Sequence, residues 1–117
     1  MTRADHDRQV EQLVVELVDA LADDWVSIPS MTTPAAAVSG TWDRRANRAL
    51  IRDALLALLE RDDVKLVDGD MSREFTNRDE LAEHLNSEWP DDGEPIARDI
   101  GWLVERDFEL RQRSEDR

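Results

Sequence analysis

The stretch FTNRDELAEHLNSEWPDDGEPIARDIGWLVERDFELRQR, Phe75 to Arg113, predicts two helices joined by a polar turn and followed by a short strand. The first helix runs from Asn77 to about Asn86 and has one apolar face, made of Leu81, Ala82 and Leu85. Asn77 suits the N-cap position, and Glu80 three residues later is typical of a capping box. The second helix is expected to begin near Pro95, and its apolar face consists of Ile96, Ile100, Leu103 and Val104.

These two helices resemble the helix-turn-helix of winged-helix repressors, and most closely that of DeoR-like and biotin-repressor-like regulators. The residues that carry the resemblance are Leu81-Ala82-x-x-Leu85 and Ile96-x-Arg98-Asp99-Ile100-x-Trp102-Leu103-x-Glu105-Arg106-x-Phe108. Together with the preceding helix, the resemblance covers about Arg44 to Arg113. It implies a three-helix core with a small β-sheet, in which the second helix of the motif enters the major groove and the following strands form a wing.

The resemblance also implies double-stranded DNA as the partner, with contacts from Arg78, Arg98, Trp102, Arg111 and Arg113. Arg98 stands on the groove-facing side of the second helix, and arginine is the side chain best suited to the paired acceptors of guanine. The turn between the helices carries carboxylates that would repel phosphates: Glu88, Asp91, Asp92 and Glu94. The alternative is a winged-helix module for protein interaction or assembly that does not bind DNA, because a fold does not dictate a function.

An amphipathic helix is expected at the N-terminus, from about Asp5 to Asp23. Its apolar stripe follows offsets of three and four, and comprises Val10, Leu13, Val14, Leu17, Val18 and Leu21. Such a stripe can pack against its own domain, or against the same helix of a second copy to form a homodimer. Both arrangements remain open on the sequence.

The middle of the chain divides into a linker and a central helix. Residues 29–42 are small, uncharged and interrupted by Pro34 and Gly40, which is typical of a linker. Trp42 is expected to anchor the end of the linker on the next helix, which runs from about Asp43 to Arg61. This helix begins with the one dense basic cluster of the chain, Arg44, Arg45, Arg48 and Arg52, which is either a solvated helix start or a phosphate-binding patch.

The predicted fold class is α+β and mostly helical, with a winged-helix-like core and a small sheet. Val64 to Thr76 predicts a strand pair around the turn Asp68-Gly69, and Phe108 to Gln112 predicts the last strand. The expected divisions are residues 1–28 for the N-terminal helix, 29–42 for the linker, 43–113 for the winged-helix-like domain and 114–117 for a frayed tail.

The composition indicates one acidic intracellular domain. The chain has 117 residues, no cysteine and a net charge of −13 from 28 acidic and 15 basic residues. No apolar run is long enough to span a bilayer and no signal peptide is recognisable, so a cytoplasmic location is expected. The acid excess favours adaptation to a salt-rich cytoplasm. Two alternatives are the codon bias of a GC-rich genome and an acidic mimic of nucleic acid.

Catalytic and metal-binding patterns are weak throughout. His6 and His84, the only histidines, stand in different segments, and His84 is expected on a helix surface. Asp68-Gly69-Asp70 lacks the ligand spacing of a calcium loop, and no glycine-rich phosphate loop follows a strand. The sequence therefore predicts no enzyme activity, no cofactor and no metal.

Overall fold

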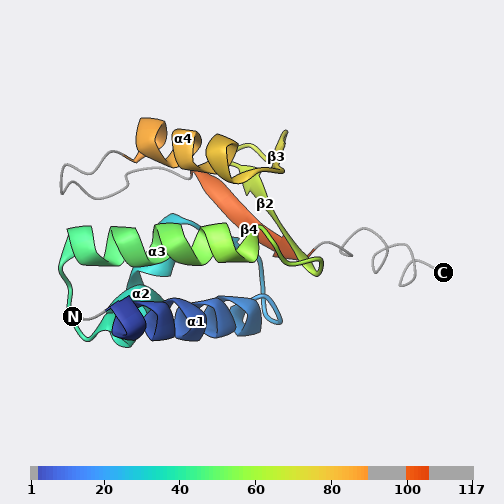
Figure 1. The fold of residues 1–117 in the computed structure, drawn as a ribbon. Coiled ribbons are helices and arrows are strands. Elements are labelled where there is room, and N and C mark those ends of the chain that lie inside the picture. The colour runs from blue at the N-terminus through green and yellow to red at the C-terminus, as the bar shows by residue number, and fades with distance from the viewer. Residues whose placement is uncertain (1–2, 90–99, 106–117) are drawn as a thin grey trace.

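The computed structural model describes residues 3–89 and 100–105, which form four α-helices, a 3-10 turn and four short strands (Figure 1). In chain order these elements are α1 (Arg3–Ala20), β1 (Val26–Ser27), η1 (Pro29–Met31), α2 (Thr32–Ser39), α3 (Arg44–Leu58), β2 (Val64–Asp68), β3 (Glu74–Phe75), α4 (Arg78–Glu88) and β4 (Gly101–Glu105). The coarse prediction of a mostly helical α+β fold with a small sheet is confirmed.

The four strands form one antiparallel sheet in the order β1-β4-β2-β3. Leu103 of β4 lies at the centre, because it is paired with Val26 on one side and with Leu66 on the other. Leu66 is paired in turn with Phe75 of β3. The last described strand therefore joins the beginning of the chain to the β2–β3 hairpin.

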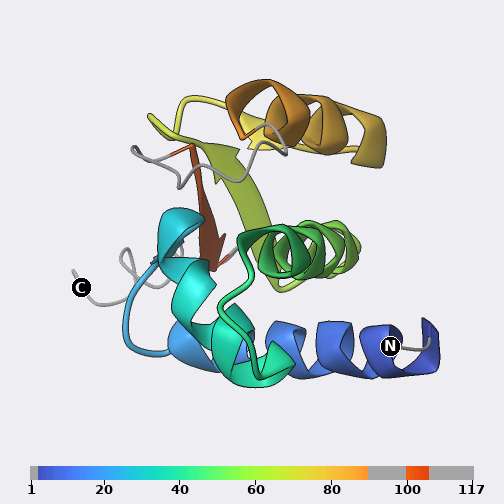
Figure 2. The same cartoon turned by 90° about the vertical axis from the view of Figure 1, so that its left-hand side faces the viewer.

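The helix α3 lies between α1 and α4 in both views (Figures 1 and 2). It runs in the same direction as α1 and opposite to α4, while α2 packs against both α1 and α3. Its apolar band is wide enough to be buried on several sides, as the sequence indicates for a central helix. The buried residues of this band are Leu50, Ile51, Ala54, Leu55 and Leu58.

The apolar stripe of α1 packs inside the domain. Leu13, Leu17 and Leu21 are 0%, 1% and 6% exposed, and Val10, Val14 and Val18 pack partly buried against the same core. Its own chain, chiefly α3 and α2, covers this stripe, so the structure shows the first of the two arrangements that the sequence left open; a dimer interface on the same helix stays a prediction. Burial in the domain satisfies the stripe without a second copy.

The predicted helix after Phe75 is confirmed as α4, and its start is capped as expected. Asn77 has extended backbone angles, and its side-chain oxygen accepts a hydrogen bond of 2.8 Å from the Glu80 N–H. Leu81 and Leu85 face the core. The helix ends at Trp89, whose N–H donates to the Leu85 carbonyl at 2.8 Å.

The second helix of the predicted motif is wrong over residues 101–105, which form β4. The short pattern Gly101-Trp102-Leu103-Val104-Glu105 fits a helix and a strand almost equally well, and pairing with β2 along its full length decides for the strand. Gly101 supports this packing, since a Cβ there would lie 2.7 Å from Ile28 Cδ1 and 2.9 Å from the Val67 carbonyl oxygen. Residues 95–99, where the same helix was expected to begin, lie outside the described residues.

The segment predicted as a linker is folded. Residues 29–39 form η1 and α2, and Met31, Ala35 and Ala36 are buried in the core. The small side chains of Ala35 and Ala36 let α2 pack closely on its neighbours, so a composition typical of linkers here serves helix packing.

The expected hairpin is confirmed as β2 and β3, and its turn is ordered by Asp68 Oδ1, which accepts hydrogen bonds from the N–H groups of Ser72 and Arg73. Hydrogen bonds from Ser72 also hold the pKa of Asp70 below its usual range.

Candidate functional site

The helices α2 and α3 are joined by a four-residue turn, Gly40 to Asp43. Gly40 ends α2 with a φ of 76°, in the left-handed region that glycine adopts without steric cost. Its N–H donates to the Ala36 carbonyl at 2.9 Å, which closes the last turn of α2. A short turn with glycine between two helices occurs both in αα-hairpins and in helix-turn-helix motifs.

A buried amide holds this turn in one conformation. Asn47 of α3 is 2% exposed. Its Nδ2 donates to the Thr41 carbonyl at 2.9 Å, and its Oδ1 accepts from Ser39 Oγ at 2.7 Å. The same hydroxyl oxygen accepts a bond from the Thr41 N–H at 3.3 Å. The end of α2, the turn and the first half of α3 therefore share one hydrogen-bond network.

The turn ends in a side-chain cap. Asp43 has extended backbone angles, and its Oδ1 accepts from the N–H groups of Arg45 and Ala46 at 3.0 and 3.5 Å. The cap fixes where α3 begins, and it places Arg44 and Arg45 in the first helical turn, where both are exposed. The carboxylate also suits the positive end of the helix dipole.

Trp42, which was expected to anchor the end of the linker on the next helix, is 71% exposed. Among the described residues it is by far the most exposed large apolar side chain, followed by Val15 at 57% and Met71 at 37%. Trp42, Arg44 and Arg45 are called the α3 tip below. Figure 1 places the start of α3 at the same end of the molecule as the start of α1 and the end of α4.

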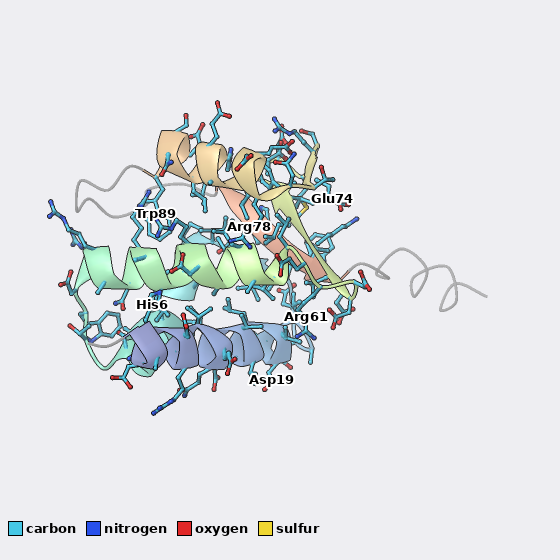
Figure 3. The ribbon with its side chains drawn as sticks, in the orientation of Figure 1. His6, Asp19, Arg61, Glu74, Arg78 and Trp89 are labelled. Atoms are coloured by element: carbon cyan, nitrogen blue, oxygen red, sulfur yellow. The ribbon has the colours of Figure 1, made fainter. Side chains whose placement is uncertain are left out.

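The other two arginines of the basic cluster are engaged inside the fold. Arg48 is 7% exposed; its Nε donates to the Trp89 carbonyl at 2.8 Å and its Nη2 to Asn86 Oδ1 at 3.3 Å. Its guanidinium also lies 5.6 Å from the centre of the Trp89 ring, so Arg48 fastens the C-terminal end of α4 to α3. Figure 3 shows Trp89 in this position, between the two helices. Arg52 is half-buried and pairs with Asp53 at 3.4 Å.

The same Asp53 binds the start of α1. His6 Nε2 lies 2.6 Å from Asp53 Oδ2, and each side chain is about one-third exposed. Figure 3 shows His6 directed from α1 toward α3. Together with Arg48, this contact holds a neighbouring helix on each side of α3 and leaves its first turn as the accessible part.

Of the residues predicted to meet DNA, the structure describes Arg78 and Trp102. Arg78 begins α4 and pairs with Glu60 at 3.2 Å. Figure 3 shows Arg78 directed from α4 toward α3. Trp102 lies in β4, and its indole Nε1 donates to the Gly69 carbonyl of the hairpin turn at 3.1 Å. Each therefore serves a contact within the fold. Arg98, Arg111 and Arg113 lie outside the described residues.

His84 is part of the packing and does not lie on an open helix surface as predicted. Its Nε2 is 2.7 Å from the Ile100 carbonyl oxygen, and its ring centre lies 4.7 Å from that of Phe75. Across residues 3–89 and 100–105, no three side chains of histidine, cysteine, aspartate or glutamate are grouped to hold a metal ion. In the same ranges, no helix combines the length and apolar character that crossing a bilayer requires.

The comparisons with known proteins found no match, whether among protein-family models, curated proteins or solved structures. The inference of function therefore depends on the geometry of the α3 tip. The sequence carried a signal for it, namely an alanine-rich run closed by Gly40 and followed by the capping residue Asp43. The helix α2 was not predicted, because the run contains a proline and its small residues give no apolar stripe.

Proposed function

We propose that the protein is a DNA-binding regulator of winged-helix type whose helix-turn-helix consists of α2, the turn at Gly40 and α3. The three helices α1, α2 and α3 supply the core that the resemblance implies, and the strands that follow α3 take the place of the wing. The helix α4 at Arg78–Glu88, which carries the first part of the resemblance in the sequence, is then an addition to this core. The motif moves toward the N-terminus by about 45 to 50 residues, to 32–58.

The observation that carries this proposal is the exposure of Trp42, Arg44 and Arg45 on a turn that Asn47 and Asp43 hold fixed. In helix-turn-helix proteins the first residues of the second helix contact base edges. Arginine fits the paired acceptors of guanine and also binds phosphates. An ordered backbone lowers the entropic cost of binding, because the side chains are presented before DNA arrives.

The acidity of the chain is compatible with this role at high salt. At molar ionic strength the screening length is about 3 Å, so repulsion between distant carboxylates and phosphates is largely suppressed. Contacts between arginine and phosphate are also weakened by salt, so binding at molar salt would depend on hydrogen bonds from the α3 tip to base edges. We therefore propose that DNA is bound in a salt-rich cytoplasm, and that binding becomes weaker in dilute buffer.

The test is selection from a random duplex library in molar KCl, followed by titration of the enriched sequence against a scrambled duplex. Arg44→Ala and Arg45→Ala should each weaken the enriched site by about 1–3 kcal/mol if they read bases. Arg8→Ala and Arg61→Ala are matched controls, since both are partly exposed arginines that pair with a nearby aspartate. Absence of any enriched sequence would refute the proposal.

The second candidate is a module that binds another protein through the same tip. One observation favours it: α3 is flanked by α1 and α4, so little of the helix beyond its first turn is open to a DNA groove. Tryptophan and arginine are also the residue types most enriched at the centres of protein interfaces. A library that yields no DNA sequence, together with a partner whose binding is lost in Trp42→Ala, would support this candidate.

A further inference from the structure

We propose that Trp42 stacks on an unpaired base, so that the protein prefers DNA with locally opened base pairs over a perfect duplex. This inference depends on the proposed function, and it concerns the form of DNA that the α3 tip recognises.

Only a short length of α3, its first turn, is accessible. A recognition helix laid along the major groove needs side chains from successive turns. In this chain Arg48 is buried and bonded to Trp89, and Arg52 is paired with Asp53, which also holds His6. The side chains that would continue a base-reading face after Arg45 are thus committed to contacts within the fold. The contact with DNA is concentrated at the tip.

Trp42 itself is exposed on an ordered turn. Trp42 is 71% exposed. On a mobile loop, such an exposed indole would usually fold back on nearby apolar surface. Here the flanking backbone is held on both sides, by Asn47 at the Thr41 carbonyl and by the Asp43 cap at the start of α3. The backbone is therefore fixed at a position where the ring is exposed, and an exposed flat aromatic surface suits a base with a free face.

Positive charge lies beside the Trp42 ring in the sequence. Arg44 and Arg45 follow Trp42 directly, and both are exposed. Proteins that bind single-stranded DNA combine aromatic side chains for stacking with cationic side chains for the backbone. Inside an intact duplex each base is already stacked on its neighbours, so Trp42 gains a partner only where a base is unpaired. The tip thus fits a short opened segment better than a continuous groove.

The experiment compares three fluorescein-labelled DNAs of one sequence in molar KCl: a perfect duplex, a duplex with a central bubble of mismatches, and the single strand. Fluorescence anisotropy should show that the wild-type protein binds the bubble about 5- to 150-fold more tightly than the duplex, the range that one base–aromatic stack produces. Trp42→Ala should lose this preference, so that it binds the bubble no more tightly than it binds the perfect duplex. Trp42→Phe should keep part of the preference.

Met71→Ala is the matched control, because Met71 is an exposed apolar residue on the distant β2–β3 turn, and this variant should retain the full preference. Circular dichroism should confirm that Trp42→Ala is folded, as expected for so exposed a side chain. Equal affinity for bubble and duplex, or a preference that persists in Trp42→Ala, would overturn the stacking inference and leave the proposed function intact. Absence of binding to all three DNAs would refute the proposed function itself.

Discussion

Asn47 and Arg48 are neighbours on α3, and they are the two buried polar residues of the described core. Asn47 is directed to the turn before the helix, whereas Arg48 is directed to the end of α4. Adjacent positions on a helix face directions about 100° apart. One helical turn can therefore order the candidate site on one side and fasten a neighbouring helix on the other.

Asn47→Ala should destabilise the protein by about 1–3 kcal/mol, because it removes the hydrogen bonds that a buried amide makes to the Thr41 carbonyl and the Ser39 hydroxyl. Urea unfolding followed by circular dichroism measures this change. The same variant should weaken the proposed DNA binding although Asn47 is buried and does not itself contact DNA, because the turn that carries Trp42 loses its order. Ser87→Ala, on the exposed face of α4, is the control and should leave both quantities unchanged. A variant with wild-type stability would show that the network does not order the turn.

Three helices and the hairpin could be predicted from the sequence because local signals specify them. The stripe from Leu13 to Leu21 and the band from Leu50 to Leu58 follow the helical period. Asn77 marks the start of α4 as a cap. The strand β4 could not be predicted, because five residues fit both periods and its partners, β1 and β2, are distant in the chain. The helix α2 was missed because alanine, serine and threonine give no apolar stripe.

Only part of the candidate site could be predicted from the sequence, for a related reason. The arginine cluster at 44–52 was recognised, but the sequence alone could not separate the exposed Arg44 and Arg45 from the buried Arg48. That separation depends on α4, which packs beside α3 from thirty residues further along the chain. Trp42 was expected to anchor the end of the linker on the next helix, but it is 71% exposed. Only the tertiary structure brings the turn to the surface.

The packing of α1 predicts the behaviour of a charged variant. Leu17→Glu should unfold the protein, because a carboxylate would enter the core at a position that is 1% exposed. Val15→Glu, two residues away on the exposed face, is the matched control and should remain folded. Circular dichroism and light scattering distinguish the outcomes. A folded monomer from Leu17→Glu, with a dimeric wild type, would instead support the dimer interface that the sequence predicted.

The close approach at β4 predicts a second effect. Gly101→Ala should cost about 1–3 kcal/mol, because the new methyl group would press on Ile28 and on the Val67 backbone. Combining it with Ile28→Val removes the nearest atom and should recover part of the loss. Thermal melting of Gly101→Ala, Ile28→Val and the double variant measures this. Equal melting temperatures for Gly101→Ala and wild type would contradict the tight packing between β4 and its neighbours.

The charge of the protein as a unit should govern its dependence on salt. With a net charge of −13, mutual repulsion opposes folding at low ionic strength. Screening should raise the stability by several kcal/mol between about 0.1 M and about 2 M KCl, a change comparable with a total of about 5–15 kcal/mol. Thermal melts over this range provide the measurement.

The matched variant replaces exposed carboxylates of α1, Asp7, Glu11 and Glu16, by their amides. Its melting temperature should rise less steeply with salt than that of the wild type, because less repulsion remains to be screened. A wild-type melting temperature independent of salt would leave codon bias as the better explanation of the acidic composition.

The central place of β4 in the sheet has a consequence for synthesis on the ribosome. Chains emerge N-terminus first, at about 5–20 residues per second. β1 and β2 do not pair with each other, since each pairs with β4, so the strand that joins them is made last. For several seconds the nascent chain holds α1, α2 and α3 with two unsatisfied strand edges, and arrival of Gly101 to Glu105 then completes the sheet. Ribosome stalling before Gly101 should therefore yield a protease-sensitive, aggregation-prone nascent chain, whereas release a few residues later should yield a resistant one.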